Sequence, residues 1–402
     1  MLAAAAGLTA ASLAHGADWR VDPTMEVGVM SDSNLRLTEG ADRVDVAGGF
    51  ANAQLEFRAA TPLALFSFTP RLEVTHFPKA GDRDEDYVNG GARALWMRRW
   101  RTGLSRMQAE FDDSATVSGN RARPSPEDGE LGNPDDPADS GSLVTDNRMR
   151  TISLRESLRF DLAERDALEV SAGYLDRKFD EQSVLDDVSF TALNGNLGWM
   201  RQLRERASLG LRLRAMRFDP ELIPLTTTSV GLEGEWRYRV SERVQSYVRA
   251  GASRTRYKAS TGPEPDAETA FVGGVGGSWQ LRMSQVFLDA TRSIDPNSSG
   301  VTVARTQLRL RLDRDFSPRA RGSLAVRVID DDGPAGFNER RYGVASVGAE
   351  WRFTQAWSLV GRYDYTWQNY RLTPGSASSN AVRLSVSWQP RREARNDASL
   401  FE

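Results

Sequence analysis

The sequence has no long uncharged apolar run. Beyond its first residues, no stretch approaches the ~18 apolar residues that a membrane-spanning helix needs. The mean hydropathy is −0.49, and charged residues make up 27% of the chain. These values exclude a helical-bundle membrane protein, but they fit a membrane barrel with a wet interior.

Cysteine is absent, and the only histidines are His15 and His76. Absence of cysteine fits an oxidising compartment, where free thiols are a liability. One or two histidines without cysteine or carboxylates at ligand spacing predict no metal site and no cofactor. His76 continues the apolar phase of segment 66–75, so we expect it to face outward. We therefore predict that the protein is not an enzyme.

Lysine is nearly absent. Of the 52 lysine and arginine residues, only Lys79, Lys178 and Lys258 are lysines. Two explanations stay open, a GC-rich genome and a functional demand for guanidinium groups. The net charge of −3 gives no reason to expect a nucleic-acid partner.

Three regions follow from composition. Residues 1–16, MLAAAAGLTAASLAHG, read as the apolar part of a secretory signal peptide. The alternative is an alanine-rich helix of a cytoplasmic protein. Residues 17–388 carry the barrel pattern, and residues 389–402 form a charged C-terminal tail.

The dominant pattern is alternation with period two, in segments of about ten residues separated by turn residues, which is typical of a membrane β-barrel. It is clearest where Leu308 and Leu310 alternate with Arg309 and Arg311. Two arginines on one strand face cannot point at lipid. The pattern predicts an all-β, transmembrane antiparallel barrel of about 18 strands, with a range of 16 to 20. The predicted strands are 19–30, 51–59, 66–75, 87–98, 102–111, 148–160, 167–179, 188–200, 208–215, 228–238, 244–254, 269–280, 284–292, 307–312, 320–329, 342–353, 358–367 and 380–388.

The connections alternate between short and long, as in barrels with short periplasmic turns and long extracellular loops. Nine of the 10 tryptophans fall at the predicted strand ends beside short turns. Indole rings collect at membrane interfaces. We predict a periplasmic aromatic girdle of Trp96, Trp199, Trp236, Trp279, Trp351 and Trp388.

Arginine dominates the polar phase of the strands, with fewer carboxylates such as Glu233 and Glu235. Guanidinium groups bind carboxylates and phosphates through paired donors, so a basic lumen favours anionic solutes or an acidic polysaccharide. The alternative is that arginines and carboxylates of neighbouring strands satisfy one another across the wall. The arginines predicted to line the substrate path are Arg155, Arg159, Arg212, Arg214, Arg305, Arg309 and Arg311.

The longest predicted loop, 112–147, is acidic. We expect it either to fold inward as a constriction opposite the basic wall or to lie in solvent as a surface loop. It lacks the spacing of a calcium-binding loop.

The early strand followed by SDSNLRL at Ser31–Leu37, and the turns LAERDALEV, LRERASLGL and VSERVQSYV, resemble a family of outer-membrane β-barrel porins associated with exopolysaccharide or capsule export. The likeness would cover nearly the whole mature chain. It implies passage of a polymer across the outer membrane and a separate periplasmic partner that delivers it. No site residue is carried over from the family.

We therefore predict a pore in the bacterial outer membrane that translocates an acidic exopolysaccharide. The alternative is a general or anion-selective diffusion porin for small solutes. The expected partners are outer-membrane lipid and lipopolysaccharide, the polysaccharide, the periplasmic export partner and the outer-membrane assembly machinery.

Overall fold

A computed structural model of the protein describes residues 17–39, 43–78, 86–115, 147–182, 187–259, 266–333, 340–370 and 375–390. These residues form strands and connections, with no helix among them. The described part of the chain contains no helix with the length and hydropathy needed to cross a bilayer.

The architecture is one sheet of 18 antiparallel strands, so the predicted fold class and strand number are confirmed. Each predicted segment lies within or overlaps one strand. The strands are β1 (Asp18–Asp32), β2 (Val46–Ala60), β3 (Ala64–His76), β4 (Tyr87–Trp100), β5 (Gly103–Ala115), β6 (Arg148–Ala163), β7 (Asp166–Phe179), β8 (Phe190–Arg204), β9 (Ala207–Pro220), β10 (Leu225–Ser241), β11 (Val244–Ala259), β12 (Glu268–Gln280), β13 (Ser284–Pro296), β14 (Thr302–Ser317), β15 (Ala320–Asp332), β16 (Arg340–Arg352), β17 (Trp357–Tyr370) and β18 (Ser376–Trp388).

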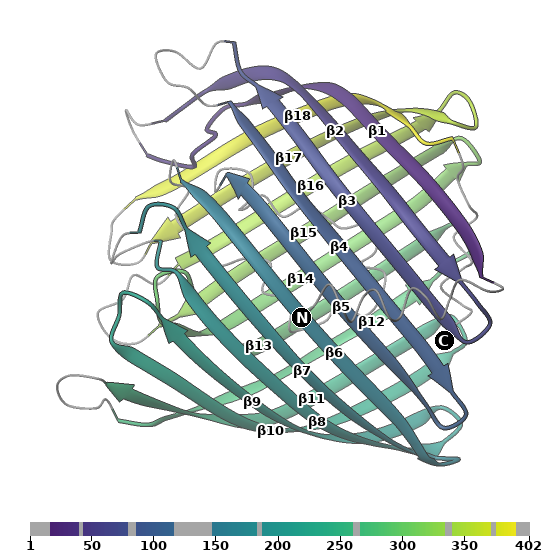
Figure 1. The fold of residues 1–402 in the computed structure, drawn as a ribbon, viewed down its shortest axis with the longest axis vertical. Coiled ribbons are helices and arrows are strands. Elements are labelled where there is room, and N and C mark those ends of the chain that lie inside the picture. Colours follow the sequence, from purple (N-terminus) through teal and green to yellow (C-terminus); the bar gives the residue numbers. More distant parts are fainter. Residues whose placement is uncertain are drawn as a thin grey trace.

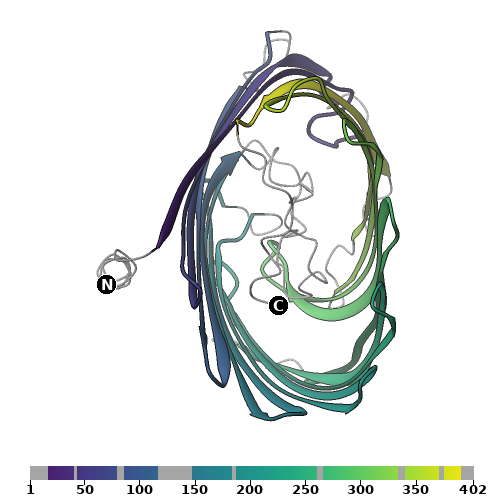
Figure 2. The same cartoon turned by 90° about the vertical axis from the view of Figure 1, so that its right-hand side faces the viewer.

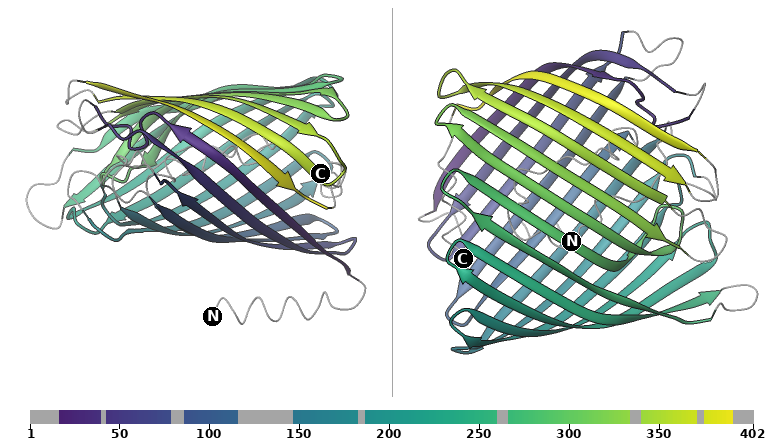
Figure 3. Two further views of the ribbon diagram at one scale, coloured as in Figure 1. Left: turned by 90° about the horizontal axis from the view of Figure 1, so that it is seen from above. Right: turned by 180° about the vertical axis from the view of Figure 1, so that it is seen from behind.

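The sheet closes on itself because β1 pairs with both β2 and β18. In the closing pair, Met25 lies opposite Trp388 and Asp32 opposite Ala381. Closure leaves no free sheet edge, so every strand finds backbone partners on both sides. Figures 1 and 3 show the strands of the two walls crossing at a steep angle, which reflects the strand tilt of a barrel. Figure 2 looks into the barrel and shows its elongated cross-section.

The two faces of the wall differ sharply. Successive side chains of a strand point to opposite faces, and directly paired residues share a face. On β9, Leu209, Leu211 and Leu213 point outward and are 41%, 49% and 44% exposed. Arg212 lies between them on the inward face, opposite Glu233 of β10. An exposed apolar belt around a closed, polar-lined barrel is the arrangement that a bilayer requires, which confirms the predicted location in the bacterial outer membrane.

The predicted girdle tryptophans all lie in the outward phase. Trp351 pairs with outward Leu359, Trp236 pairs with outward Val248, and Trp388 contacts Trp357 with ring centroids 6.3 Å apart. All six lie near the ends of strands that enter short turns. Their role as a membrane-interface girdle stays a prediction that this placement favours.

The difference in length between the connections at the two barrel ends is less regular than the sequence predicted. At the end with short turns, connections such as 164–165 and 205–206 hold two residues. At the opposite, long-loop end, the connections 221–224 and 297–301 are also short. The predicted signal peptide 1–16, nearly all of loop 112–147, and tail residues 391–402 lie outside the described residues.

Candidate functional site: a lumen wall of ion pairs

The seven predicted path arginines all lie in the inward phase. Arg155 and Arg159 are on β6, Arg212 and Arg214 on β9, and Arg305, Arg309 and Arg311 on β14. Arg155 and Arg159 of β6 lie on a part of the wall separated from β9 by the strands β7 and β8. Arg249 on β11 lies between the β9 and β14 groups, facing inward opposite Glu235. We call twelve of the inward charges of β9 to β15 the charge ladder: Arg212, Arg214, Glu233, Glu235, Arg249, Asp289, Arg305, Arg309, Arg311, Asp313, Arg321 and Asp331. The same inward face also carries Arg237 and Arg327.

Five arginines of the charge ladder contact carboxylates of the wall: Arg212, Arg305, Arg309, Arg311 and Arg321. Arg305 donates from Nε to Asp331 Oδ1 at 2.7 Å and from Nη2 to Oδ2 at 2.9 Å, and both side chains are almost fully buried. Arg309 donates to Asp289 at 2.9 Å. Such bidentate pairs hold a guanidinium in a fixed plane.

Further pairs continue the ladder in both directions. Asp313 accepts from Arg311 at 2.8 Å and lies 3.2 Å from Arg321. Glu235 lies 3.5 Å from Arg212. The sequence-based alternative, in which arginines and carboxylates satisfy one another across the wall, therefore describes these residues. Asp289, Asp313 and Asp331 were not among the carboxylates singled out from the sequence. The partners of Asp289 and Asp331 depend on strand register, whereas Arg311 and Asp313 lie two residues apart on β14.

Glycines of β12 make room for the inward side chains of Arg249 and Tyr247. Gly274 and Gly276 face inward, opposite Arg249 and Tyr247 of β11. A Cβ atom on Gly276 would lie 2.7 Å from the Tyr247 ring, and one on Gly274 would lie 3.1 Å from Arg249 Nε. The Tyr247 hydroxyl reaches across β12 and donates to Asp289 of β13. The glycines that the sequence places inside this strand are thus close-approach positions.

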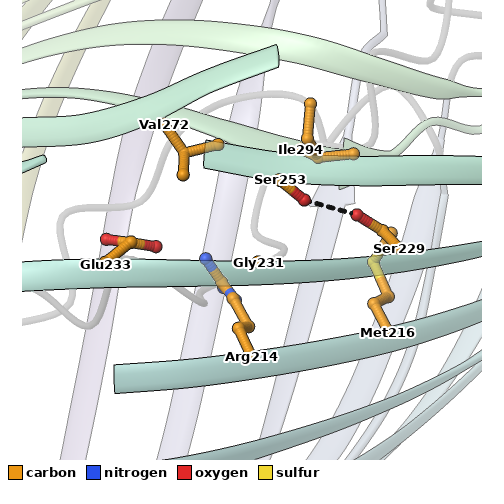
Figure 4. Close-up of a pocket in the computed structure, with 8 residues that line it drawn as sticks. All are labelled: Arg214, Met216, Ser229, Gly231, Glu233, Ser253, Val272 and Ile294. Atoms are coloured by element: carbon orange, nitrogen blue, oxygen red, sulfur yellow. Dashed lines mark hydrogen bonds between the residues drawn. The ribbon is translucent and has the colours of Figure 1, made fainter. Parts of the chain in front are cut away.

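A small recess lies within the ladder, between β9 and β13. Figure 4 shows Arg214 pointing toward the space beside Glu233, with Val272 and Ile294 on the far side. Ser229 and Ser253 share a hydrogen bond of 2.7 Å at its edge. The recess thus combines opposite charges, hydroxyls and apolar groups in one place.

The opposite wall is built in the same way. Arg71 of β3 donates to Asp112 at 2.7 Å and to Glu110 at 3.3 Å, across β4. Gly91 of β4 lies between them, and a Cβ there would meet Arg71 Nε at 2.9 Å. On β17, Arg362 donates to Asp364 at 2.8 Å. Charge pairing therefore occurs on both walls, although inward Arg327, directly opposite Arg309, has no ion pair among the described residues.

One connection folds inward at the long-loop end, beside β15 to β18. Leu37 is buried against the inward side chains of Ile329, Tyr342 and Val344. Its carbonyl accepts a hydrogen bond of 2.7 Å from Gln368 of β17. Leu37 has φ +52, a left-handed conformation that costs a leucine about 1 kcal/mol or more and is repaid by this packing. The segment Ser31–Leu37 that carries the family resemblance therefore covers part of the lumen wall.

A second connection, 297–301, spans the mouth from the other side. The Val188 N–H donates to the Ser298 carbonyl at 2.8 Å, and both residues are fully buried. The strands next to them, β8 and β14, are separated by five strands of the barrel wall. Gly300 has φ +80, and a Cβ there would lie 2.5 Å from Ile223. This bridge narrows the mouth above β9 to β13, and no sequence signal indicated it.

Neither a metal site nor a catalytic histidine has support among the described residues. No group of three or more histidine, cysteine or carboxylate side chains there is arranged to hold a metal ion. His76 lies in the outward phase at the long-loop end, as its place in the sequence pattern predicted. There it contacts Asp86. The predicted inward folding of loop 112–147 falls outside the described residues.

Comparisons with known proteins found solved structures of similar shape. No family model and no curated protein matches the chain. Similar structures include OccAB4 from Acinetobacter baumannii, with 12% identity, TM-score 0.46, and coverage of 92% of this chain and 98% of that chain. The outer membrane protein opdK from Pseudomonas aeruginosa has 13% identity, TM-score 0.46, and coverage of 92% and 98%. OpdO from Pseudomonas aeruginosa has 14% identity, TM-score 0.47, and coverage of 92% and 97%. From its own residues, this chain is a transmembrane β-barrel of the outer-membrane type, with a lumen wall of ion pairs and a mouth narrowed by two inward connections.

Proposed function

We propose that the barrel is a passive diffusion pore for small hydrophilic solutes. The observation that carries this proposal is the state of the inward arginines. The ladder arginines Arg305, Arg309 and Arg311 are hydrogen-bonded to wall carboxylates, and the other predicted path arginines also have interaction partners. A wall of paired charges is hydrated and polar, but presents little net field to a passing ion.

The narrowed mouth supports small solutes over polymer. Two inward connections, one at Leu37 and one at Ser298, cover the lumen wall from different sides. Their contacts are buried and hydrogen-bonded, so opening them costs free energy. Because both connections cover part of the lumen wall, they reduce the width left for a passing solute, which favours small solutes over a polymer.

The first test alters the size of the mouth. Pro296 and Thr302 are already paired, so replacing residues 297–301 with a two-residue Asn-Gly turn closes the β13–β14 hairpin without the bridge. We expect the refolded variant to conduct more ions, and its liposomes to admit larger neutral sugars than wild type does. The matched control replaces Glu205-Arg206, already a two-residue turn at the opposite end, with Asn-Gly. Unchanged size limits in the 297–301 variant would contradict the proposal.

Export of an acidic exopolysaccharide is the second candidate, favoured by the resemblance at Ser31–Leu37. Its basic-lumen support is weakened by the wall carboxylates that bind the arginines. Planar-bilayer conductance with and without added acidic polysaccharide separates the two. Steady current indifferent to polymer is the result expected of a diffusion pore, whereas a mostly closed channel or one blocked by polymer favours export.

A further inference from the structure

The outward face of β11 carries an unusual row of cations at the long-loop end. Arg254, Arg256 and Lys258 occupy three successive outward positions, and all three side chains are exposed. Alternate residues of a strand are ~6.6 Å apart, so the row spans about 13 Å. We call it the cation row.

Within the described part of the chain, the cation row has no ion-pair partner. By contrast, five outward cations on other strands at this end have one: Arg148 with Asp113, Lys178 with Glu221, Arg217 with Asp219, Arg292 with Asp332, and Arg341 with Asp330. Arg150 is a single exposed cation without such a pair. Three like charges in succession repel one another unless an anion lies between them.

The carboxylates near the cation row are engaged elsewhere or point away. Asp219 accepts from Arg217 at 2.8 and 3.3 Å and from the Thr226 hydroxyl at 2.8 Å. Glu268 pairs in register with inward Thr255 and accepts from Tyr257. Asp266 lies in the connection before β12 and forms no ion pair with the described residues. The immediate outward neighbours are instead hydroxyls, because Thr228 lies opposite Arg256 and Thr226 opposite Lys258.

The height of the cation row matches a membrane surface. Below it on β11, outward Val244, Val248, Ala250 and Ala252 are apolar, with only Ser246 between them. The eight residue steps from Val244 to Ala252 rise about 20 Å along the membrane normal at a tilt near 40°. An apolar belt of about 25 Å is typical, so Arg254 begins where the headgroups begin.

We propose that the cation row and the neighbouring Thr228 bind the phosphate groups of a phosphorylated lipid in the outer leaflet, as in the lipid A part of lipopolysaccharide. Arginine and lysine pair with phosphate oxygens, and the Thr228 hydroxyl beside Arg256 adds a donor, whereas the Thr226 hydroxyl already donates to Asp219. The acyl chains would lie on the apolar surface directly below, beside exposed Val248 and Phe271. A soluble phosphate would have no use for that surface, so the position favours a lipid. This proposal does not depend on the solute that the pore passes.

The test compares two triple variants of the folded barrel in detergent. R254Q/R256Q/K258Q removes the cation row, and R217Q/R292Q/R341Q removes three paired cations at the same end. Retention of diphosphoryl lipid A is measured by native mass spectrometry and by titration, with monophosphoryl lipid A and glucose 1-phosphate as further probes. Loss of the cation row should weaken diphosphoryl lipid A binding at least tenfold, and the control should change it less than threefold.

Two further measurements separate a loss of charge from a change in the fold and test the role of the lipid phosphates. R254K/R256K keeps the charges and should retain most of the binding, which separates charge from an altered fold. Monophosphoryl lipid A should bind wild type more weakly than diphosphoryl lipid A, and this difference should vanish without the cation row. Equal losses in both triple variants, unchanged binding without the cation row, or glucose 1-phosphate binding as tightly as lipid A would each overturn the proposal.

Discussion

The two faces of β14 show how this barrel treats charge. Its outward residues Leu308, Leu310 and Leu312 meet lipid, while Arg309 and Arg311 on the inward face meet carboxylates. Inward charges are numerous because the same strand or a neighbouring strand supplies a partner at hydrogen-bond distance, as Asp313 of β14 and Asp289 of β13 do. Outward charges are confined mostly to the strand ends, where water and headgroups solvate them. The faces thus differ in how a charge is compensated, not only in polarity.

Glu156 departs from this rule. It is an exposed outward residue near the middle of β6, opposite Met107 and Ala172. Phe160, which contacts Trp100, lies four residues along the strand, so Glu156 is about 10 Å above the aromatic level. No described residue forms an ion pair with it. This carboxylate offers a direct way to test the comparison.

The largest expected effect comes from breaking the most buried inward pair. Arg305→Leu leaves Asp331 buried without its cation, which should lower the free energy of unfolding by about 3 to 5 kcal/mol. Urea unfolding of the barrel in lipid vesicles measures it. Arg305→Leu/Asp331→Leu should recover most of the loss, and a double variant as unstable as the single one would show that pairing is not the cause.

Placing a charge on the opposite face should cost nearly as much. Leu310→Arg puts a guanidinium in the middle of the lipid-facing surface of β14, which should destabilise the folded barrel by about 2 to 4 kcal/mol. Leu310→Met, of similar volume, serves as the control and should cost less than about 1.5 kcal/mol. Similar unfolding curves for the two variants would mean that this face does not meet hydrocarbon.

Removing the exceptional outward charge should stabilise the protein. Glu156→Leu is expected to raise the free energy of unfolding by about 1 kcal/mol, because a carboxylate in hydrocarbon costs less than a guanidinium but is still unfavourable. Glu156→Gln should give a smaller gain. A loss of stability in Glu156→Leu would indicate that Glu156 has a partner in the membrane.

The smallest effect concerns pH at the outward rim. The Phe77 N–H donates to Asp86 at 2.6 Å and His76 contacts the same carboxyl, and these interactions hold the pKa of Asp86 below its ordinary value. The stabilisation is therefore complete above the unfolded pKa and is lost as pH falls through the lower folded pKa. The protection of the Phe77 amide against hydrogen exchange, taken relative to its intrinsic exchange rate at each pH, should fall in one step on acidification in wild type. In Asp86→Asn it should show no such acid step, and an identical step in both would rule out Asp86.

The strand pattern could be predicted because the bilayer imposes one alternation on each strand. The predicted segment 208–215 fell within β9, but the strand extends to Pro220 because hydrogen bonding continues where the apolar belt ends. The inward phase of all seven path arginines followed from the same alternation. Their partners did not, because Asp331 reaches Arg305 only through the register of β14 and β15. The inward connections were also missed, since Leu37 and Ser298 lie in polar segments whose direction depends on distant strands.

Ion selectivity in a salt gradient tests the paired lumen wall most directly. Because five carboxylates offset most of the charge of the seven ladder arginines, wild type should be only weakly anion-selective, with a small reversal potential. Asp289→Asn/Asp313→Asn should make the pore anion-selective by freeing Arg309, Arg311 and Arg321, and Arg309→Gln/Arg311→Gln should shift it toward cations. A wild-type pore that is strongly anion-selective and unchanged by the Asp289→Asn/Asp313→Asn pair would contradict the account.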